Sequence, residues 1–101
     1  MNISSNISSI NSHQTMMNTS ANNVANVNTD GFRPSDTKIS SNTESTAANS
    51  RLSADTGSEK SQTDVAKELT DQIIAQDATA VNVSAIKSQD EMLGSLLDIK
   101  A

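Results

Sequence analysis

The sequence VAKELTDQIIAQDATAVNVSAIKSQDEMLGSLLDIKA, residues 65–101, decides the fold of this chain. Its apolar residues recur at steps of three and four, which is the spacing of one face of an α-helix. Nothing in it interrupts a helix before Gly94. We therefore predict a helix over about 63–100, roughly 55 Å long at 1.5 Å per residue. The side chains predicted to form its packing face are Leu69, Ile73, Gln76, Ala80, Val83, Ile86, Leu93 and Leu97.

The rest of the 101-residue chain offers this helix few partners. Ser, Asn, Thr and Asp dominate residues 1–63, and Phe32 is the only aromatic residue. Such a composition buries too little apolar surface to offset the loss of chain entropy on folding. We expect partial disorder in the free monomer and folding on assembly.

Residues 1–28 nevertheless carry a narrow apolar stripe. Its members fall four and three residues apart, a heptad pattern typical of a coiled-coil face. The surrounding Ser, Asn and Thr residues are mediocre helix formers, so only a partner that covers the stripe would hold this helix. A disordered tail is the alternative for the free monomer. The stripe consists of Ile3, Ile7, Ile10, Gln14, Met17, Ala21, Val24 and Asn28.

The sequence ANNVANVNTDGFRP, residues 21–34, indicates the end of that helix. Gly31 can adopt the left-handed conformation that terminates a helix, and Pro34 blocks its continuation. Phe32 can then fold back onto the last turn. Asn22 and Asn26 lie four residues apart on one face, where their amides predict hydrogen bonds from a neighbouring element.

This segment resembles the Ala-Asn-Asn-Ile-Ala-Asn-x-Asn-Thr-x-Gly-Phe/Tyr signature of the bacterial flagellar axial proteins, which are the rod, hook and hook-junction subunits. Most members of that family have Pro before the Gly, whereas this chain has Asp30. The resemblance implies helix packing or contacts between subunits for the matching residues Ala21, Asn22, Asn23, Val24, Asn26, Gly31 and Phe32.

We predict an irregular linker over residues 31–62, because after Phe32 only Ile39 and Leu52 are large and apolar there. No alternation of apolar and polar residues predicts strands. A short helical piece near Thr46–Leu52 is the only regular element that we expect. Larger members of the resembled family carry a β-rich domain between their terminal helices, and nothing in this linker predicts one.

The C-terminal stretch carries a second resemblance. Flagellar rod and hook subunits end in a helix whose last part reads Asp-Glu-Met-Leu-x-x-Leu-Leu-x-Ile, which this chain matches at residues 90–99. The resemblance implies packing or inter-subunit roles for Asn82, Asp90 and Met92. The chain departs from the family at Asp77, where Arg is preferred, and at Thr79, where Tyr is preferred. These departures indicate a helix surface that differs from that of a standard rod protein.

The charge of the chain excludes some classes of partner. Its net charge is −5 and its pI is about 4.5, with no basic patch and no interleaved aromatic residues. This balance argues against binding to nucleic acid or to an anionic membrane. No run of residues reaches transmembrane length, and the N-terminus lacks the basic and apolar regions of a Sec-type signal.

No pattern in the sequence predicts catalysis, a cofactor or a metal ion. His13 is the only His and there is no Cys, so neither a zinc-thiolate site nor a nucleophile with its base is predicted. The spacing of Asn26, Asn28 and Asp30 imitates half of a calcium loop. Thr37 stands where that loop requires Glu, which argues against calcium. We therefore expect a protein that is not an enzyme.

The predicted fold is all-α. A helix in the N-terminal segment 1–30 and a helix in the C-terminal segment 63–101 pack as an antiparallel coiled coil, with no middle β domain. The long helix has more apolar surface than the short one can cover, which predicts contacts with other subunits. The uncovered side chains include Ile74, Val81, Met92, Leu96 and Ile99.

The resemblance implies a structural subunit of the bacterial flagellar basal-body rod. Such a subunit would be exported by the flagellar type III apparatus and would polymerise into the axial tube in the periplasm. Its partners would be other rod or hook subunits and the export machinery, in a homo- or hetero-oligomeric helical assembly. The alternative is a soluble coiled-coil adaptor, or an export-regulating binding module, that carries rod-like termini.

Overall fold

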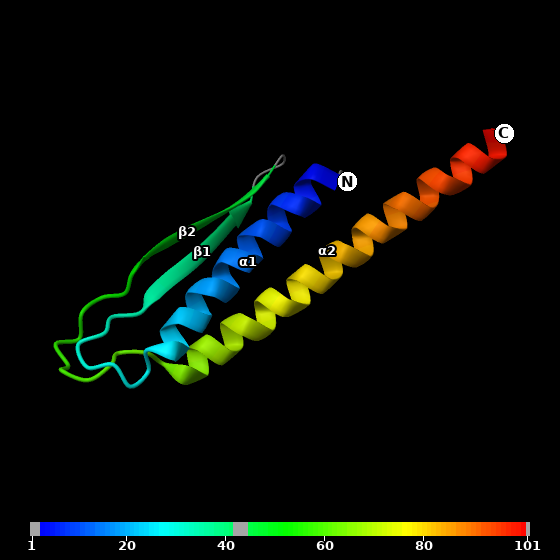
Figure 1. Cartoon of the computed structure of the whole chain (residues 1–101). Coiled ribbons are helices and arrows are strands. Elements are labelled where there is room, and N and C mark those ends of the chain that lie inside the picture. The colour runs from blue at the N-terminus through cyan, green and yellow to red at the C-terminus, as the bar shows by residue number, and fades with distance from the viewer. Residues whose placement is uncertain (1–2, 42–44, 101) are drawn as a thin grey trace.

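The computed structural model describes residues 3–41 and 45–100. The elements in chain order are helix α1 (Ile3–Ala25), strand β1 (Ser35–Ser41), strand β2 (Thr46–Leu52) and helix α2 (Val65–Lys100). They form an elongated molecule of 67 × 21 × 14 Å (Figure 1). The predicted terminal segments 1–30 and 63–101 extend into residues 1–2 and 101, which lie outside the described residues.

Helices α1 and α2 run antiparallel, side by side (Figure 1). Asn23, near the end of α1, bonds Glu68 at the start of α2, while Ser9 bonds Asn82 further along. The residue numbers of each pair add up to 91, which fixes the register of the two helices. By this register Ile3 lies opposite residue 88, so α2 continues beyond the described start of α1.

Strands β1 and β2 form an antiparallel hairpin that packs on α1. Its register runs from the pair Ser35↔Leu52 to the pair Ser41↔Thr46. The prediction of an all-α fold without a middle β element is therefore wrong. The predicted irregular linker over 31–62 contains two strands, and the expected helical piece at Thr46–Leu52 is strand β2.

The hairpin escaped prediction because its inner face packs on small and polar groups. Its more buried positions include Thr37, Ile39, Thr46 and Ala48. Most of these side chains are small or polar, so they do not stand out in the sequence from the exposed positions between them. Period-two alternation appears in a sequence only where a strand buries large side chains on one face. Here the strands pack on a polar surface of α1, so the alternation of apolar and polar residues that predicts a strand is absent.

Two chain segments cross at the end of the molecule where α1 stops and α2 begins. Gly31 has a φ of 75°, in the left-handed region, and its N–H donates to the carbonyl of Glu59 at 2.8 Å. The N–H of Gln62 donates to the carbonyl of Phe32 at 3.0 Å. These backbone bonds hold the chain leaving α1 against the chain entering α2. Helix α2 then starts after Asp64, whose carboxylate accepts from the N–H groups of residues 66 and 67 as an N-cap.

The contact between the two helices is made by small and polar side chains. Ala75 and Pro34 are the only buried apolar residues in the part of the chain that the structure describes. The buried polar residues are Asn6, Ser12, Ser20, Asn23, Thr37 and Glu68. A core of this kind gains little from the hydrophobic effect and depends on satisfied hydrogen bonds.

Candidate assembly interface

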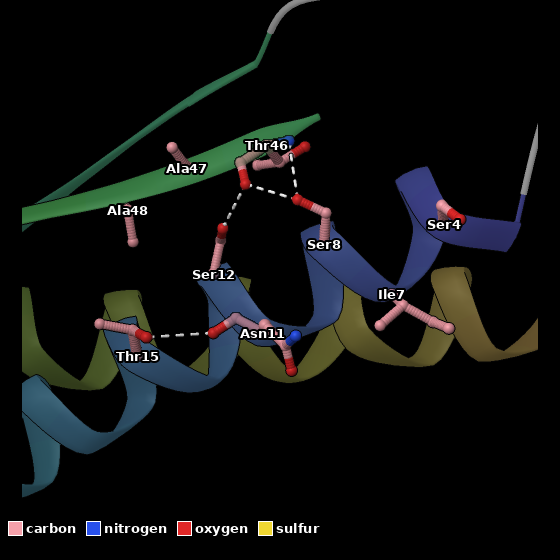
Figure 2. A pocket seen from close by; sticks show the side chains of 9 residues that line it. All are labelled: Ser4, Ile7, Ser8, Asn11, Ser12, Thr15, Thr46, Ala47 and Ala48. Atoms are coloured by element: carbon pink, nitrogen blue, oxygen red, sulfur yellow. Dashed lines mark hydrogen bonds between the residues drawn. The ribbon is translucent and has the colours of Figure 1, made fainter. Parts of the chain in front are cut away.

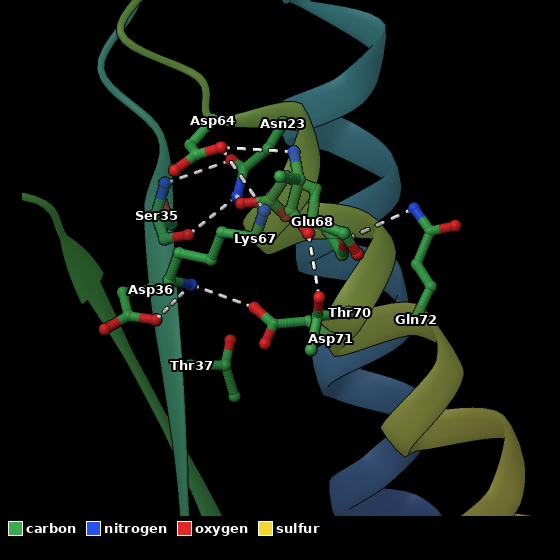
Figure 3. A network of polar contacts seen from close by, with 12 residues as sticks. Asn23, Ser35, Asp36, Thr37, Asp64, Lys67, Glu68, Thr70, Asp71 and Gln72 are labelled. Carbon is green, nitrogen blue, oxygen red and sulfur yellow. Dashed lines mark hydrogen bonds and ion pairs between the residues drawn. The ribbon is translucent and has the colours of Figure 1, made fainter.

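The side chain of Asn23 connects three elements of the fold. Its Nδ2 donates to the carbonyl of Ser35 at 2.7 Å and to Oε1 of Glu68 at 3.0 Å, and its Oδ1 accepts from the N–H of Ser35 at 3.0 Å (Figure 3). Its own carbonyl accepts from the hydroxyl of Thr63 at 3.0 Å. The amide pairs with the backbone of Ser35 as a neighbouring strand would, and it also reaches α2. One side chain thus joins α1, β1 and α2.

Glu68 lies beneath this amide on α2 and is almost fully buried, at 2% exposure. Its backbone carbonyl accepts from the hydroxyl of Ser20 at 2.9 Å, and Gln72 donates to the same hydroxyl at 3.2 Å. The second carboxyl oxygen, Oε2, has no hydrogen-bond partner among the described residues. The carboxyl therefore depends on Asn23, because a buried polar group without a partner is costly. We call Ser20, Asn23, Ser35 and Glu68 the polar clamp.

Lys67 adds a second link between α2 and the hairpin. Its ammonium lies 2.9 Å from Asp36 of β1 and 2.9 Å from Asp71 of its own helix (Figure 3). Burial lowers the pKa of Lys67, but hydrogen bonds to the two carboxylates and their negative charges outweigh it, so the pKa lies above its ordinary value. The Lys67 side chain is 45% exposed, so this link contributes modestly to stability.

The far end of the hairpin is held by hydroxyls of α1. Ser8 and Ser12 donate to the carbonyl of Thr46 at 2.6 and 3.0 Å, and the N–H of Thr46 donates to Ser8 at 3.0 Å (Figure 2). An open groove runs between this part of α1 and β2, past Asn11 and Ala48 (Figure 2). Since the clamp holds Ser35 at the other end, α1 carries the hairpin along most of its length.

The large apolar side chains lie mostly on the outside of this polar framework. The exposed ones are Ile3, Ile7, Leu52, Val65, Leu69, Ile73, Ile74, Val81, Val83, Met92, Leu93, Leu96, Leu97 and Ile99, each at least 43% exposed. Singly exposed apolar residues are ordinary on protein surfaces. A set of this extent marks an interaction surface, because the described residues bury only two apolar residues, Ala75 and Pro34.

One apolar surface lies on the side of the helix pair that faces away from the hairpin. Successive helix residues are about 100° apart, so Ile10 points away from Ser8 and Ser12, which hold the hairpin. In α2, Leu69 likewise points away from Lys67, which bonds the hairpin. By the same 100° spacing, the apolar residues on this side are the ones that we call the apolar flank: Ile3, Ile10, Met17, Leu69 and Val83.

The second apolar surface is the end of α2. Every residue from Asp90 to Ile99 is exposed, because α1 does not extend along this part of α2. We call residues 90–99 the overhang. Helix α2 has 36 residues and α1 has 23, so their lengths differ by roughly 20 Å at 1.5 Å per residue. The seven-residue line of α2 positions that faces α1 continues beyond Gln89 as Leu96, and Met92 and Leu93 lie on either side of it.

The structure places the sequence-predicted residues in three groups. Asn23, Asn82, Gly31 and Phe32 make hydrogen bonds that join separate segments of the chain. Asn26 bonds only within its own turn, to Asn22 and Thr29. Ile10, Met17, Val24 and Ile86 are partly buried, and the exposed ones are Ala21, Asn22, Leu69, Ile73, Gln76, Val83, Asp90, Met92, Leu93 and Leu97.

The predicted packing faces of the two helices are therefore not their contact surface. Leu69 and Ile73 are 53% and 59% exposed, whereas Glu68 and Ala75 are buried against α1. Glu68, Ala75, Asn82 and Gln89 recur every seven residues and face α1. This heptad of small and polar residues is visible in the sequence, but the apolar stripe beside it gives a stronger signal. Ser8, Ser12, Ser20, Ser35, Thr63 and Glu68 were absent from the predicted site because nothing local marks their long-range partners.

The described residues contain no group of three or more His, Cys, Asp or Glu residues that could hold a metal ion. None of the described helices is long and apolar enough to cross a membrane.

One comparison with known proteins matches the C-terminal part of the chain. Residues 57–99, which include nearly all of α2, match the family described as flagellar basal body rod FlgEFG protein C-terminal. A search among curated proteins found no match. The match covers the clamp residue Glu68, the overhang and the α2 part of the apolar flank. It confirms the resemblance read from the sequence: the C-terminal part of this chain is similar to the C-terminal part of flagellar rod proteins.

Proposed function

We propose that this chain is a structural subunit of the flagellar rod, which leaves the cell through the flagellar type III export apparatus and polymerises into the axial tube in the periplasm. One observation carries the proposal. The segment that matches the rod family is also the segment whose large apolar side chains are exposed in the isolated chain. The exposed apolar side chains of a helix that resembles rod subunits are best explained by assembly with other subunits.

The small core supports the proposed export route. Because Ala75 and Pro34 are the only buried apolar residues of the described chain, folding of a single copy gains little free energy from burial. A chain of low stability unfolds easily, as passage through a narrow channel requires. Folding then becomes favourable where other subunits cover the exposed surfaces.

The proposal gives each of the three predicted segments of the chain a role. The N-terminal segment 1–30 and the C-terminal segment 63–101 supply the axial helices. The segment between them supplies the hairpin, which α1 holds at both ends. The polar clamp keeps the three parts in one arrangement, while the apolar flank and the overhang make the contacts between subunits.

Purified basal bodies provide the test. The chain has no Cys, so single cysteines at Asn26 and Asp90 give unambiguous cross-links in intact motors. We expect the chain to remain in basal bodies after washing and Asp90→Cys to cross-link to rod or hook subunits. Asn49→Cys, exposed on the hairpin, is the matched control and is expected to cross-link less. A chain found only in the cytoplasm, in a one-to-one complex, would support the adaptor alternative and overturn the rod proposal.

A further inference from the structure

We propose that the outer edge of β2 binds an extended acidic segment of another protein, which adds a third strand to the hairpin. The edge is free, α1 leaves it uncovered, and two cations stand on the outer face of the hairpin beside it. The hairpin lies outside the α2 segment on which the proposed rod function rests, so the two proposals stand or fall separately.

The backbone of β2 has a side that is free beyond Thr46. The N–H of Ser53 donates to the carbonyl of Pro34 at 2.9 Å, which makes these two residues a hydrogen-bonded pair of the ladder. Such pairs alternate in an antiparallel ladder, so the backbone groups of residues 46, 48, 50 and 52 point away from β1. Those of Thr46 bond hydroxyls of α1 (Figure 2). The outward groups over Ala48–Leu52 have no partner among the described residues, and such an edge is a template for another strand.

Helix α1 crosses beneath the hairpin diagonally and leaves this edge uncovered. At one end α1 holds the outer edge of β2 at Thr46, and at the other end the polar clamp holds the outer edge of β1. Burial follows this path, because Thr37 of β1 is buried whereas its partner Ser50 in β2 is exposed. Leu52, at the end of the free edge, is 58% exposed. An added strand would therefore cover an apolar side chain as well as bond the backbone.

The outer face of the hairpin favours an acidic partner. Arg51 of β2 pairs with Asp36 of β1, so both side chains lie on this face, and Lys38 lies there too, two residues along β1. The carboxylate of Asp36 is bonded to Lys67 of α2 at 2.9 Å. Lys38 and Arg51 have no ion pair with any described residue, and they line a common hollow. Carboxylates on an added strand would meet these cations directly.

The same charges argue against a second copy of this chain as the added strand. Strand β2 of a second copy would bring another Arg51 and no carboxylate, and like charges on neighbouring strands are destabilising. The segment that fits is as long as β2, which has seven residues. It carries Asp or Glu at alternate positions, beside Arg51, and apolar residues between them, on the face that covers Leu52.

The test titrates the full-length chain, folded by the osmolyte trimethylamine N-oxide, into the dye-labelled peptide Val-Glu-Val-Glu-Val-Glu-Val. Fluorescence anisotropy measures binding. We expect Arg51→Glu to bind this peptide at least about tenfold more weakly than wild type, because repulsion replaces attraction. Lys87→Glu is the matched control, since it changes the net charge equally at an exposed position of α2, and it should bind like wild type. The same peptide with Lys in place of Glu should bind at least about tenfold more weakly to wild type.

A second set of probes tests the strand edge. Ser50→Pro removes an outward N–H of β2 without removing a bond of the ladder, whereas Ser50→Ala keeps that N–H. Both lose the hydroxyl contact with Thr37 at 2.8 Å, so only Ser50→Pro should lose the acidic peptide. Two further peptides, each methylated on alternate backbone nitrogens, leave the protein unchanged. The one methylated on the side that faces β2 should bind at least about tenfold more weakly than the other.

Equal binding of the acidic and the Lys-containing peptide would overturn the inference, and so would equal binding of the two methylated peptides. Wild-type chains that pair with themselves through β2 would overturn it as well. Such pairing would appear in analytical ultracentrifugation as a dimer that Ser50→Pro abolishes and Ser50→Ala keeps. None of these results bears on the rod proposal, because retention of the chain in basal bodies is measured independently.

Discussion

Replacement of Asn23 by Ala tests the polar clamp most directly. The substitution removes hydrogen bonds of 2.7 and 3.0 Å to the backbone of Ser35 and one of 3.0 Å to the carboxyl of Glu68. Each bond to a neutral group contributes about 1 kcal/mol, and a bond to a charged carboxylate contributes about 1.5–3 kcal/mol. The sum is roughly 4 kcal/mol. Water that enters the gap recovers part of this, so we expect a net loss of about 3 kcal/mol.

The assay must suit a chain of low stability. Folding is followed by circular dichroism while the osmolyte trimethylamine N-oxide is added, because osmolytes strengthen burial and bring marginal proteins into their folding range. The Asn23→Ala variant should need clearly more osmolyte than wild type to reach its folding midpoint. A loss of about 3 kcal/mol corresponds to a change of more than a hundredfold in the folding equilibrium constant.

Asn22→Ala provides the matched control at the neighbouring position. Asn22 is exposed, and the group that accepts from the Asn26 side chain is its backbone carbonyl, which the substitution keeps. Both substitutions replace Asn by Ala in the same helix, so the gain in helix propensity is similar and cancels in the comparison. If Asn23→Ala costs no more stability than Asn22→Ala, the clamp does not hold the three elements together and the reasoning fails.

Three further predictions concern the isolated chain. Circular dichroism of the dilute monomer should show no sharp cooperative melt, and a two-state transition typical of a stable helical domain would contradict the small core. The raised pKa of Lys67 means that its pairs with Asp36 and Asp71 stabilise the fold fully below the ordinary Lys value and lose that effect only as the pH rises through the raised pKa. Lys67→Met should therefore cost at most about 1 kcal/mol at pH 7, and the difference from wild type should shrink only in strong alkali, as followed by osmolyte titration. Gly31→Ala should destabilise by about 1 kcal/mol because φ is 75°, whereas Gly94→Ala, in the helix interior with open space around it, should stabilise by a similar amount in the same titration.

The sequence predicted the two helices for a clear physical reason. The long stretch after Thr63 contains no Pro and only one Gly, at position 94, so nothing interrupts its hydrogen-bond ladder. It also predicted Asn23 as a site residue, through the resemblance of its segment. The predicted orientation of α2 was wrong, because the apolar stripe through Leu69 and Ile73 was assumed to face the partner helix.

The remaining errors come from interactions between residues far apart in the chain. The strand at Thr46–Leu52 is fixed at one end by hydroxyls of Ser8 and Ser12, more than 30 residues away in sequence. The other strand is fixed by the amide of Asn23, twelve residues before Ser35. No local pattern of apolar residues records such contacts. They become visible only when α1, with its many Ser and Asn side chains, is placed beside the backbone that it binds.

The polar contact between α1 and α2 has a thermodynamic consequence. Burial of apolar surface gives folding its large heat-capacity change, and the described chain buries only two small apolar residues, Ala75 and Pro34. Folding of one copy should thus have a small heat-capacity change and a shallow response to denaturant. If neighbouring copies cover the exposed Leu and Ile side chains, the large negative heat-capacity change belongs to polymerisation instead. Cooling would then weaken the polymer and release chains, while it leaves the hydrogen-bonded arrangement within each chain almost unaffected.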